Sequence, residues 1–166
     1  MSTTTAASPR RILVVANETV ASDILHVAIR EQVRDAMGSQ VLVVAPALNS
    51  RVRHWLSDDN QARLAARLRL ASCLDRLVEA RVEAEGLVGD ADPLQAIDDA
   101  LCTFPANSLI IATHPEGRSN WLARDLVTRA TERFGLPTTH IVADSVARSA
   151  TLASSSLAGT PTTAAA

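Results

Sequence analysis

The feature that most constrains this chain is an alternation of short apolar runs with longer segments of helical periodicity. The runs lie near residues 12–16, 41–45, 85–88, 109–112 and 138–143. Most are continuous rather than alternating, which suits strands that are buried on both faces. In the segments between them, apolar residues recur at steps of three and four, as on one face of a helix. Such a series predicts a Rossmann-like, three-layer α/β/α fold with a five-stranded parallel sheet.

Two of the predicted helices have well-marked ends. The first begins near residue 21, and Gly38 stands where a C-terminal glycine cap is expected. The third has Asp92 as N-cap and Pro93 as its first residue, and Gln95 occupies the capping-box position. Because capping explains Asp92, we favour it over a metal site formed by Asp90 and Asp92.

The longest predicted helix covers residues 60–84 and carries an apolar stripe along one face. Its members recur at steps of three and four residues: Leu64, Leu68, Ala71, Leu74 and Val78. Arginines and acids lie mostly elsewhere on this helix. We interpret its charged face as solvated rather than as a binding surface.

The composition excludes several classes of function. The chain has 166 residues, 47% of them hydrophobic, which is ample for one domain with a core. Its net charge of -2 gives no electrostatic reason to expect nucleic acid or an anionic membrane as partner. All 16 basic residues are arginine, so Schiff-base enzymes, Walker-type phosphate loops and Ser–Lys hydrolases are excluded for want of a lysine.

Cysteine and histidine usage predicts neither a disulfide nor a metal site. Cys73 and Cys102 lie in apolar helical surroundings and are expected to be small core residues. The four histidines are scattered, without a second ligand at metal-binding spacing. No apolar run reaches transmembrane length, and the run after Arg10 and Arg11 is too short for a signal peptide, so we expect a cytoplasmic protein.

The two ends of the chain differ in composition from its middle. Residues 1–9 and 145–166 are rich in small and polar residues without periodicity, which predicts disordered tails. Residues 10–144 would form the single α/β domain, and every candidate site residue falls within it.

The most informative stretch for function is SLIIATHPEGRSNW, residues 108–121. An apolar strand feeds a polar turn, and a helix begins again at Ser119 or Asn120. The unpaired backbone N–H groups and the dipole of such a helix start favour an anion. Gly117 and Arg118 could therefore cradle a phosphate. The alternative is that Ser119 or Asn120 merely caps the helix beside a solvated Arg118.

In an open parallel sheet, ligands bind at the carboxyl ends of the strands, where the strand order reverses. We therefore assign the ligand-binding candidates to two loops at this edge: Asn17, Thr19, Thr113, His114, Gly117, Arg118, Ser119 and Asn120. His114 and Glu116 could form an acid–base pair. We favour His114 as a hydrogen-bonding wall of the loop, so no catalytic residue is assigned and an enzyme is not predicted.

The connection over residues 46–60 offers a possible lid. Arg51, Arg53, His54 and Trp55 could close over a ligand, with Trp55 stacking on a base and an arginine meeting a phosphate. The alternative, which we favour, is a surface loop in which Trp55 packs on its own helix.

Several of these segments resemble universal stress protein domains. ILVVANETVAS, from Ile12, resembles their first strand and turn, and VGDADPLQAI, from Val88, resembles their third. SLIIATHPEGRS, from Ser108, resembles the fourth strand with its glycine-rich loop, and LPTTHIV, from Leu136, the final strand. The resemblance extends in order over residues 10–143.

The resemblance implies a strand order of 3-2-1-4-5, a homodimer, and a ligand crevice between strands one and four. Because members of that family bind ATP there, ATP or AMP is the candidate ligand. The chain departs from the family's ATP motif in three places. Asn17 stands in place of an aspartate, Ala112 in place of the first loop glycine, and no Gly–Ser or Gly–Thr pair follows Gly117 at the family spacing.

These observations predict a regulatory protein of the stress-response type that binds a nucleotide or another small anionic ligand at the strand 1/strand 4 crevice. The alternative is a dimeric interaction module of the same fold that binds no nucleotide. A nucleotide-transferring enzyme is disfavoured, because the sequence has no HIGH-type or SGG-type loop and no lysine.

Overall fold

The computed structural model describes residues 9–16, 18–34, 36, 38–47, 59–114 and 122–143. The strands in this part are β1 (Arg11–Ala16), β2 (Gln40–Pro46), β3 (Ala84–Gly89), β4 (Ser108–Thr113) and β5 (Thr138–Val142). The helices are α1 (Asp23–Arg34), α2 (Asp59–Glu79), α3 (Pro93–Thr103) and α4 (Leu122–Phe134), with a 3-10 turn, η1 (Glu18–Ala21), before α1. Apart from Pro9, the predicted tails at residues 1–9 and 145–166 lie outside the described residues.

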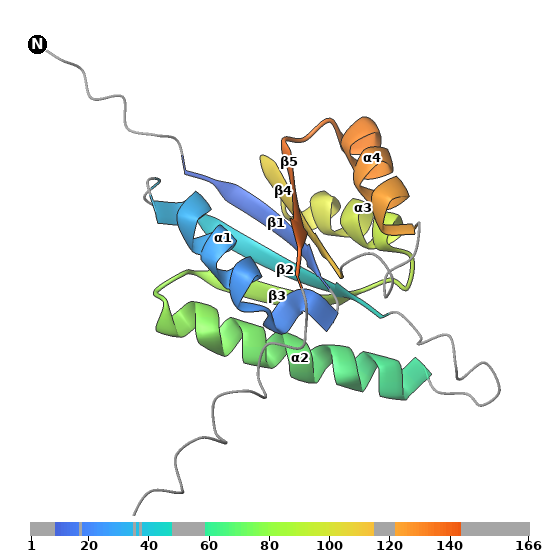
Figure 1. Ribbon diagram of the computed structural model, residues 1–166, viewed down its shortest axis with the longest axis horizontal. Coiled ribbons are helices and arrows are strands. Elements are labelled where there is room, and N and C mark those ends of the chain that lie inside the picture. The colour runs from blue at the N-terminus through green and yellow to red at the C-terminus, as the bar shows by residue number, and fades with distance from the viewer. Residues whose placement is uncertain are drawn as a thin grey trace, which may run out of the picture.

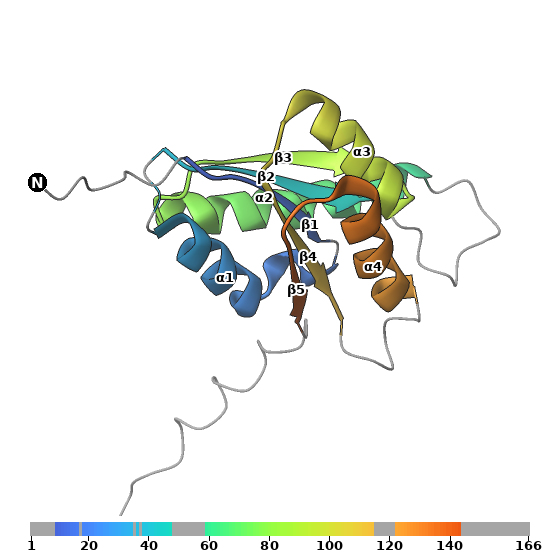
Figure 2. The same ribbon diagram turned by 90° about the horizontal axis from the view of Figure 1, so that it is seen from above.

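All of these strands run parallel in one sheet, in the order β3-β2-β1-β4-β5. β1 is central, and its Val14 is in register with Val43 of β2 on one side and with Ile110 of β4 on the other. Helices α1 and α2 cover one face of the sheet, and α3 and α4 cover the other (Figure 1 and Figure 2). The predicted fold class is confirmed, as is the strand order that the resemblance implied.

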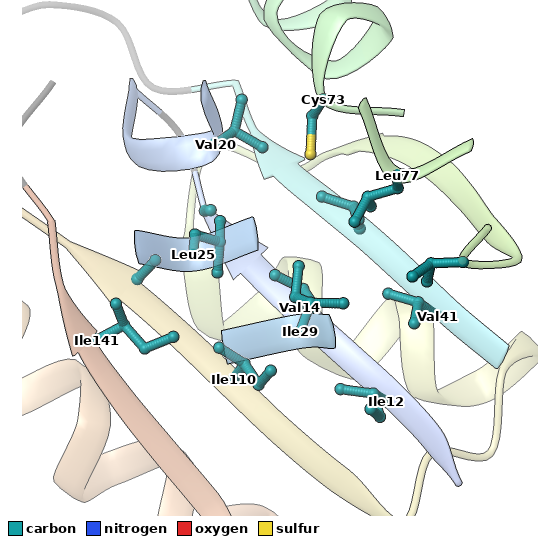
Figure 3. Close-up of a cluster of buried hydrophobic side chains, with 14 of the residues drawn as sticks. Ile12, Val14, Val20, Leu25, Ile29, Val41, Cys73, Leu77, Ile110 and Ile141 are labelled. Atoms are coloured by element: carbon teal, nitrogen blue, oxygen red, sulfur yellow. The ribbon is translucent and has the colours of Figure 1, made fainter. Parts of the chain in front are cut away.

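Each face of the sheet has its own hydrophobic core, which explains why the strand sequences are continuously apolar. Ile12 and Val14 of β1 pack with side chains of α1 and α2, as Figure 3 shows. Leu13 and Val15 point the other way and pack with α3 and α4. Because successive side chains of a strand point to opposite faces, a strand covered on both sides needs an apolar residue at every position.

The apolar stripe predicted on the longest helix does not form one buried face. In α2, Leu64, Leu68 and Val78 are 56%, 65% and 66% exposed. Over residues 63–79 of α2, the buried residues are Ala66, Leu70, Cys73 and Leu77. The helix lies close over Gly86 of β3, where an added Cβ would stand 2.8 Å from side-chain carbons of Leu70 and Leu74. Leu74 of the predicted stripe therefore packs on the sheet beside Leu70, whereas Leu64, Leu68 and Val78 lie on the exposed side of the helix.

The same helix also ends earlier than predicted, at Glu79 rather than near residue 84. Arg81 adopts a left-handed backbone conformation with a φ of 59°. The N–H of Arg81 donates to the carbonyl oxygen of Val78 at 2.8 Å, and the N–H of Val82 donates to that of Leu77 at 2.9 Å. These bonds form a Schellman C-cap, a motif that usually has glycine at the left-handed position. With arginine there, the sequence carries no stop signal and the apolar periodicity overruns the helix end.

The start of α3 confirms the predicted cap but not the capping box. Asp92 accepts a hydrogen bond at 2.8 Å from the amide two residues later, and Pro93 is the first helical residue. The side chain of Gln95 donates to Asp99 at 2.7 Å instead of reaching back to the cap. The N–H of Asp92 donates to the carboxylate of Asp90 at 2.8 Å, so Asp90 takes the role expected of Gln95.

The two cysteines differ, and the core position predicted for Cys102 is wrong. Cys73 is buried between α2 and the sheet, and this burial raises the pKa of its thiol to about 11. Cys102 is exposed, because it stands on the opposite side of α3 from the buried Ile97 and Ala100.

Candidate ligand site at the carboxyl ends of β1 and β4

The winding of the chain reverses between β1 and β4. From β1 the chain passes through α1 to β2 on one face of the sheet, whereas α3, on the other face, leads into β4. The two strands are nevertheless neighbours, with Ala16 in register with Ala112. At such a switch point the loops that leave two adjacent strands diverge, and ligands of open α/β sheets bind between them.

Thr19 holds the turn after β1 against the end of β4. It lies in η1, is 1% exposed, and its hydroxyl donates to the carbonyl oxygen of Ala112 at 3.0 Å. The hydroxyl proton is therefore already used in a hydrogen bond within the protein. Thr19, predicted as a ligand-binding residue, fixes the spacing of the two strand ends instead of offering a donor.

The other side of this turn is anchored to α2 by Arg76. Its guanidinium donates to the carbonyl oxygen of Ala21 at 2.8 Å and forms an ion pair with Asp23. Nearby, Nδ1 of His26 lies 2.6 Å from the carbonyl oxygen of Ser22. Burial lowers the pKa of His26 below its ordinary value of 6.5, so the neutral ring donates to Ser22. Arg76 is thus an exception to the expectation that the α2 arginines are solvated, and no local pattern indicates it because its contacts depend on the tertiary fold.

Thr113, the last residue of β4, is paired with His140 of β5. Its Oγ1 and the histidine Nε2 are 2.8 Å apart, and the tautomer decides which atom donates. With the proton on Nε2, the ring donates to Oγ1 and leaves the Thr113 hydroxyl proton for an acceptor such as a phosphate oxygen. No sequence pattern marks His140 as a site residue, because its proximity to Thr113 follows from the β4–β5 register.

Of the other predicted site residues, His114 is the one within the described ranges. It directly follows β4 and is half-buried. The remaining ligand-binding candidates, the predicted lid and Glu116 lie outside those ranges: Asn17, Gly117, Arg118, Ser119, Asn120, Arg51, Arg53, His54 and Trp55. The structure thus gathers Thr19, Thr113 and His114 around the end of β4 and adds His140 to them.

The part of the chain that the structure describes holds no group of three or more His, Cys, Asp or Glu residues that could bind a metal ion. Asp90 and Asp92, weighed as metal ligands, both accept backbone hydrogen bonds at the start of α3. Among the described helices, none is long and apolar enough to cross a membrane.

Two solved structures share this architecture. A universal stress protein family protein from Arabidopsis thaliana with AMP bound matches 82% of this chain and 93% of its own, with a TM-score of 0.54 and 14% sequence identity. A universal stress protein in complex with cAMP matches 82% of this chain and 100% of its own, with a TM-score of 0.51 and 16% identity. The chain has the universal stress protein fold.

At 14% and 16% identity, the similarity to these two structures is one of fold. No protein-family model and no curated protein matches the chain by sequence. The universal stress protein fold nevertheless agrees with the strand and turn segments whose resemblance was evident from the sequence. The strand order of the sheet is also the one that the resemblance implied, and this order creates the switch point between β1 and β4.

Proposed function

We propose that this chain is a cytoplasmic regulatory protein that binds a nucleotide, or a related small anionic ligand, at the carboxyl ends of β1 and β4. The observation that carries the proposal is the switch point, where adjacent strands are connected to helices on opposite faces of the sheet. Two solved structures with this fold contain AMP and cAMP, ligands of the proposed class.

In this proposal the loop after β4 supplies most of the contacts. Backbone N–H groups from Gly117 onward and the guanidinium of Arg118 would meet a phosphate, and the amide of Asn17 would bind the sugar or base. Thr113 would add a hydroxyl donor in the tautomer in which His140 donates to it. These groups bind and orient a ligand, and none is assigned as a general acid or base, so we propose binding rather than turnover.

The second candidate function is a dimeric interaction module that binds no nucleotide. The exposed apolar row of α2 favours it, because such a surface is typical of protein–protein contacts. The commitment of the Thr19 hydroxyl to Ala112 also removes one predicted ligand donor. The two functions are compatible, but only the first predicts stabilisation by a ligand.

Thermal unfolding with and without ATP, AMP or cAMP tests the proposed function. A ligand at a hundred times its dissociation constant stabilises the folded state by about 2.7 kcal/mol, which for a chain of this size raises the melting temperature by about 5–10 °C. Mass spectrometry of the small molecules released on denaturing freshly purified protein would identify a ligand that copurifies.

The matched variants are Arg118→Ala in the predicted loop and Arg34→Ala at the last residue of α1. We expect Arg118→Ala to reduce the ligand-induced shift and Arg34→Ala to preserve it. If none of the three nucleotides shifts the melting temperature of the unmodified protein and none copurifies with it, the nucleotide proposal is wrong. The interaction module then becomes the better account.

A further inference from the structure

The outer edge of β3 offers backbone hydrogen-bonding groups to a partner. β3 is the last strand on its side of the described sheet. The carbonyl oxygens of Glu83 and Gly89 accept hydrogen bonds from N–H groups of β2 and of the residue that follows it. Since the backbone groups of successive strand residues point alternately to the two sides, those of Gly86 and Val88 point away from β2. No strand in the described part of the chain pairs with them.

Little in the sequence of β3 protects this edge from pairing. Natural sheet edges commonly carry a lysine, a proline or an inward-pointing charge that prevents a further strand from adding. β3 has the sequence AEGLVG, without lysine or proline, and its Leu87 is 41% exposed. Its one charged residue, Glu85, lies on the face opposite α2, because the next residue, Gly86, faces α2. Such an edge is a template for an extended peptide, which binds by strand addition.

An apolar groove beside this edge gives the side chains of such a peptide a place to pack. The groove has a volume of about 350 Å³ and lies between α2 and β3, with Ala71, Leu74 and Val88 in its lining. Gly86 also lines it, and α2 lies so close that an added Cβ would stand 2.8 Å from a side-chain carbon of Leu74. A strand added to β3 places every second side chain on the α2 side of the sheet, where the groove lies.

Two arginines line the same groove. Arg63 and Arg67 are exposed residues in the N-terminal half of α2. Within the described ranges, neither forms an ion pair. Their guanidinium groups give this end of the groove a positive charge, which is complementary to the carboxylates of a partner.

We propose that the β3 edge binds an extended acidic segment of another protein, which adds to the sheet as a further strand. α2 runs antiparallel to β3, because a short turn joins the end of the helix to the start of the strand. Toward the carboxyl end of β3, the apolar position at Ala71 is therefore followed by Arg67 and then by Arg63. Four helical residues advance about 6 Å and two strand residues about 6.6 Å, so these positions match side chains two residues apart in a strand.

The spacing defines the sequence that this edge recognises. An apolar residue is followed at the second and fourth positions by aspartate or glutamate, in a segment that runs parallel to β3. The apolar side chain packs beside Ala71, and the two carboxylates meet Arg67 and Arg63. Hydrogen bonds with the backbone of β3 supply affinity, and the alternate side chains supply specificity. The ligand site proposed above lies at β1 and β4, so the two proposals can fail independently.

Fluorescence anisotropy tests the recognition, with the labelled peptide Thr-Val-Thr-Glu-Thr-Glu-Thr titrated with the full-length protein. We expect saturable binding, and Arg63→Glu and Arg67→Glu should each raise the dissociation constant about tenfold or more. A peptide with glutamine in place of both glutamates should bind more weakly and should not respond to Arg67→Glu. Arg30→Glu, at an exposed position on α1, is the matched control and should leave the dissociation constant unchanged.

Amide hydrogen exchange tests the strand addition itself. In the free protein, the N–H groups of Gly86 and Val88 should exchange faster than those of Glu85 and Leu87, which face β2. The peptide should slow exchange at Gly86 and Val88 selectively.

N-methylation of the peptide is a second test of the backbone pairing. Methylation of one alternate set of its amides should abolish binding, because it removes the donors to β3. Methylation of the other set, whose N–H groups face solvent, should preserve binding.

Four results would overturn the proposal. They are no saturable peptide binding up to about 1 mM, binding that neither arginine variant weakens, and unchanged exchange at Gly86 and Val88 in the presence of bound peptide. The fourth is a dimer in which the amides of Gly86 and Val88 are already protected, because a second copy of the chain would then occupy the edge.

Discussion

At the scale of single residues, His26 makes the stability of the folded state depend on pH. Its ring is buried against Ser22, and burial lowers its pKa below 6.5. Between pH 6.5 and the lower pKa of the folded state, the unfolded chain binds more protons than the folded protein. We therefore expect the stability contribution of neutral His26 to be fully present well above pH 6.5 and to be lost as the pH falls through this window.

Urea unfolding at several pH values between about 5 and 8 measures this effect. The control is His26→Gln, which cannot titrate. We expect the variant to be less stable than the unmodified protein at neutral pH but to show a flatter dependence on pH in this range. Equal slopes for the two proteins would contradict the assigned role of His26.

The two thiols should differ sharply in reactivity. Cys102 is exposed, whereas Cys73 is buried and its pKa is raised to about 11. The Cys73 thiol is therefore inaccessible to a reagent and stays protonated at neutral pH. A colorimetric thiol reagent should modify one cysteine in the native protein and the second only on unfolding. Cys102→Ser should abolish the fast reaction, and rapid modification of both thiols in the native protein would show that the α2 packing is wrong.

Residue roles that depend on neighbours in sequence were predictable, and those that depend on distant residues were not. Asp92 could be assigned as a cap because its partner is two residues away. The contacts of Arg76 with Ala21 and of His140 with Thr113 span separations of 55 and 27 residues. No local pattern encodes such contacts, because the strand register and the placement of α2 create them.

At the scale of elements, the end of α2 offers a test of backbone strain. Arg81 has a φ of 59°, a conformation that glycine adopts at lower cost. We expect Arg81→Gly to raise the free energy of unfolding by about 0.5–1 kcal/mol, measured by chemical denaturation.

The matched control is Gly135→Ala after α4. Gly135 has a φ of 63°, and nothing lies within 4 Å of an added Cβ, so this change isolates the conformational cost. It should lower stability by about 1 kcal/mol. An unchanged or lowered stability in Arg81→Gly would contradict the assigned C-cap.

The orientation of α2 shows what periodicity can and cannot decide about an element. The segment contains two rows at helical spacing, one through Leu64, Leu68 and Val78 and one through Leu70 and Leu77. Sequence alone favours the first row, because more of its members are large and apolar. The structure buries the second row, and the missing side chain of Gly86 in β3 leaves the space that Leu70 fills. Leu64, Leu68 and Val78 of the first row stay exposed.

At the scale of the whole molecule, the fold class was predictable from the sequence, because continuous apolar runs identify strands covered on both faces. The strand order 3-2-1-4-5 came from the resemblance and is confirmed. The order itself determines where a ligand can bind, since it places the switch point between β1 and β4. The chemistry of the site is less predictable, because it depends on contacts among four elements: η1, α2, β4 and β5.

The central claim is that a nucleotide binds at the carboxyl ends of β1 and β4, and amide chemical shifts test it most directly. A chain of 17.6 kDa is suitable for two-dimensional NMR of isotope-labelled protein titrated with AMP. We predict saturable shifts at Thr19, Ala112 and Thr113 and in the loop that follows β4. No saturable shift at these positions, or shifts confined to the α2–β3 groove around Leu74 and Leu87, would contradict the claim.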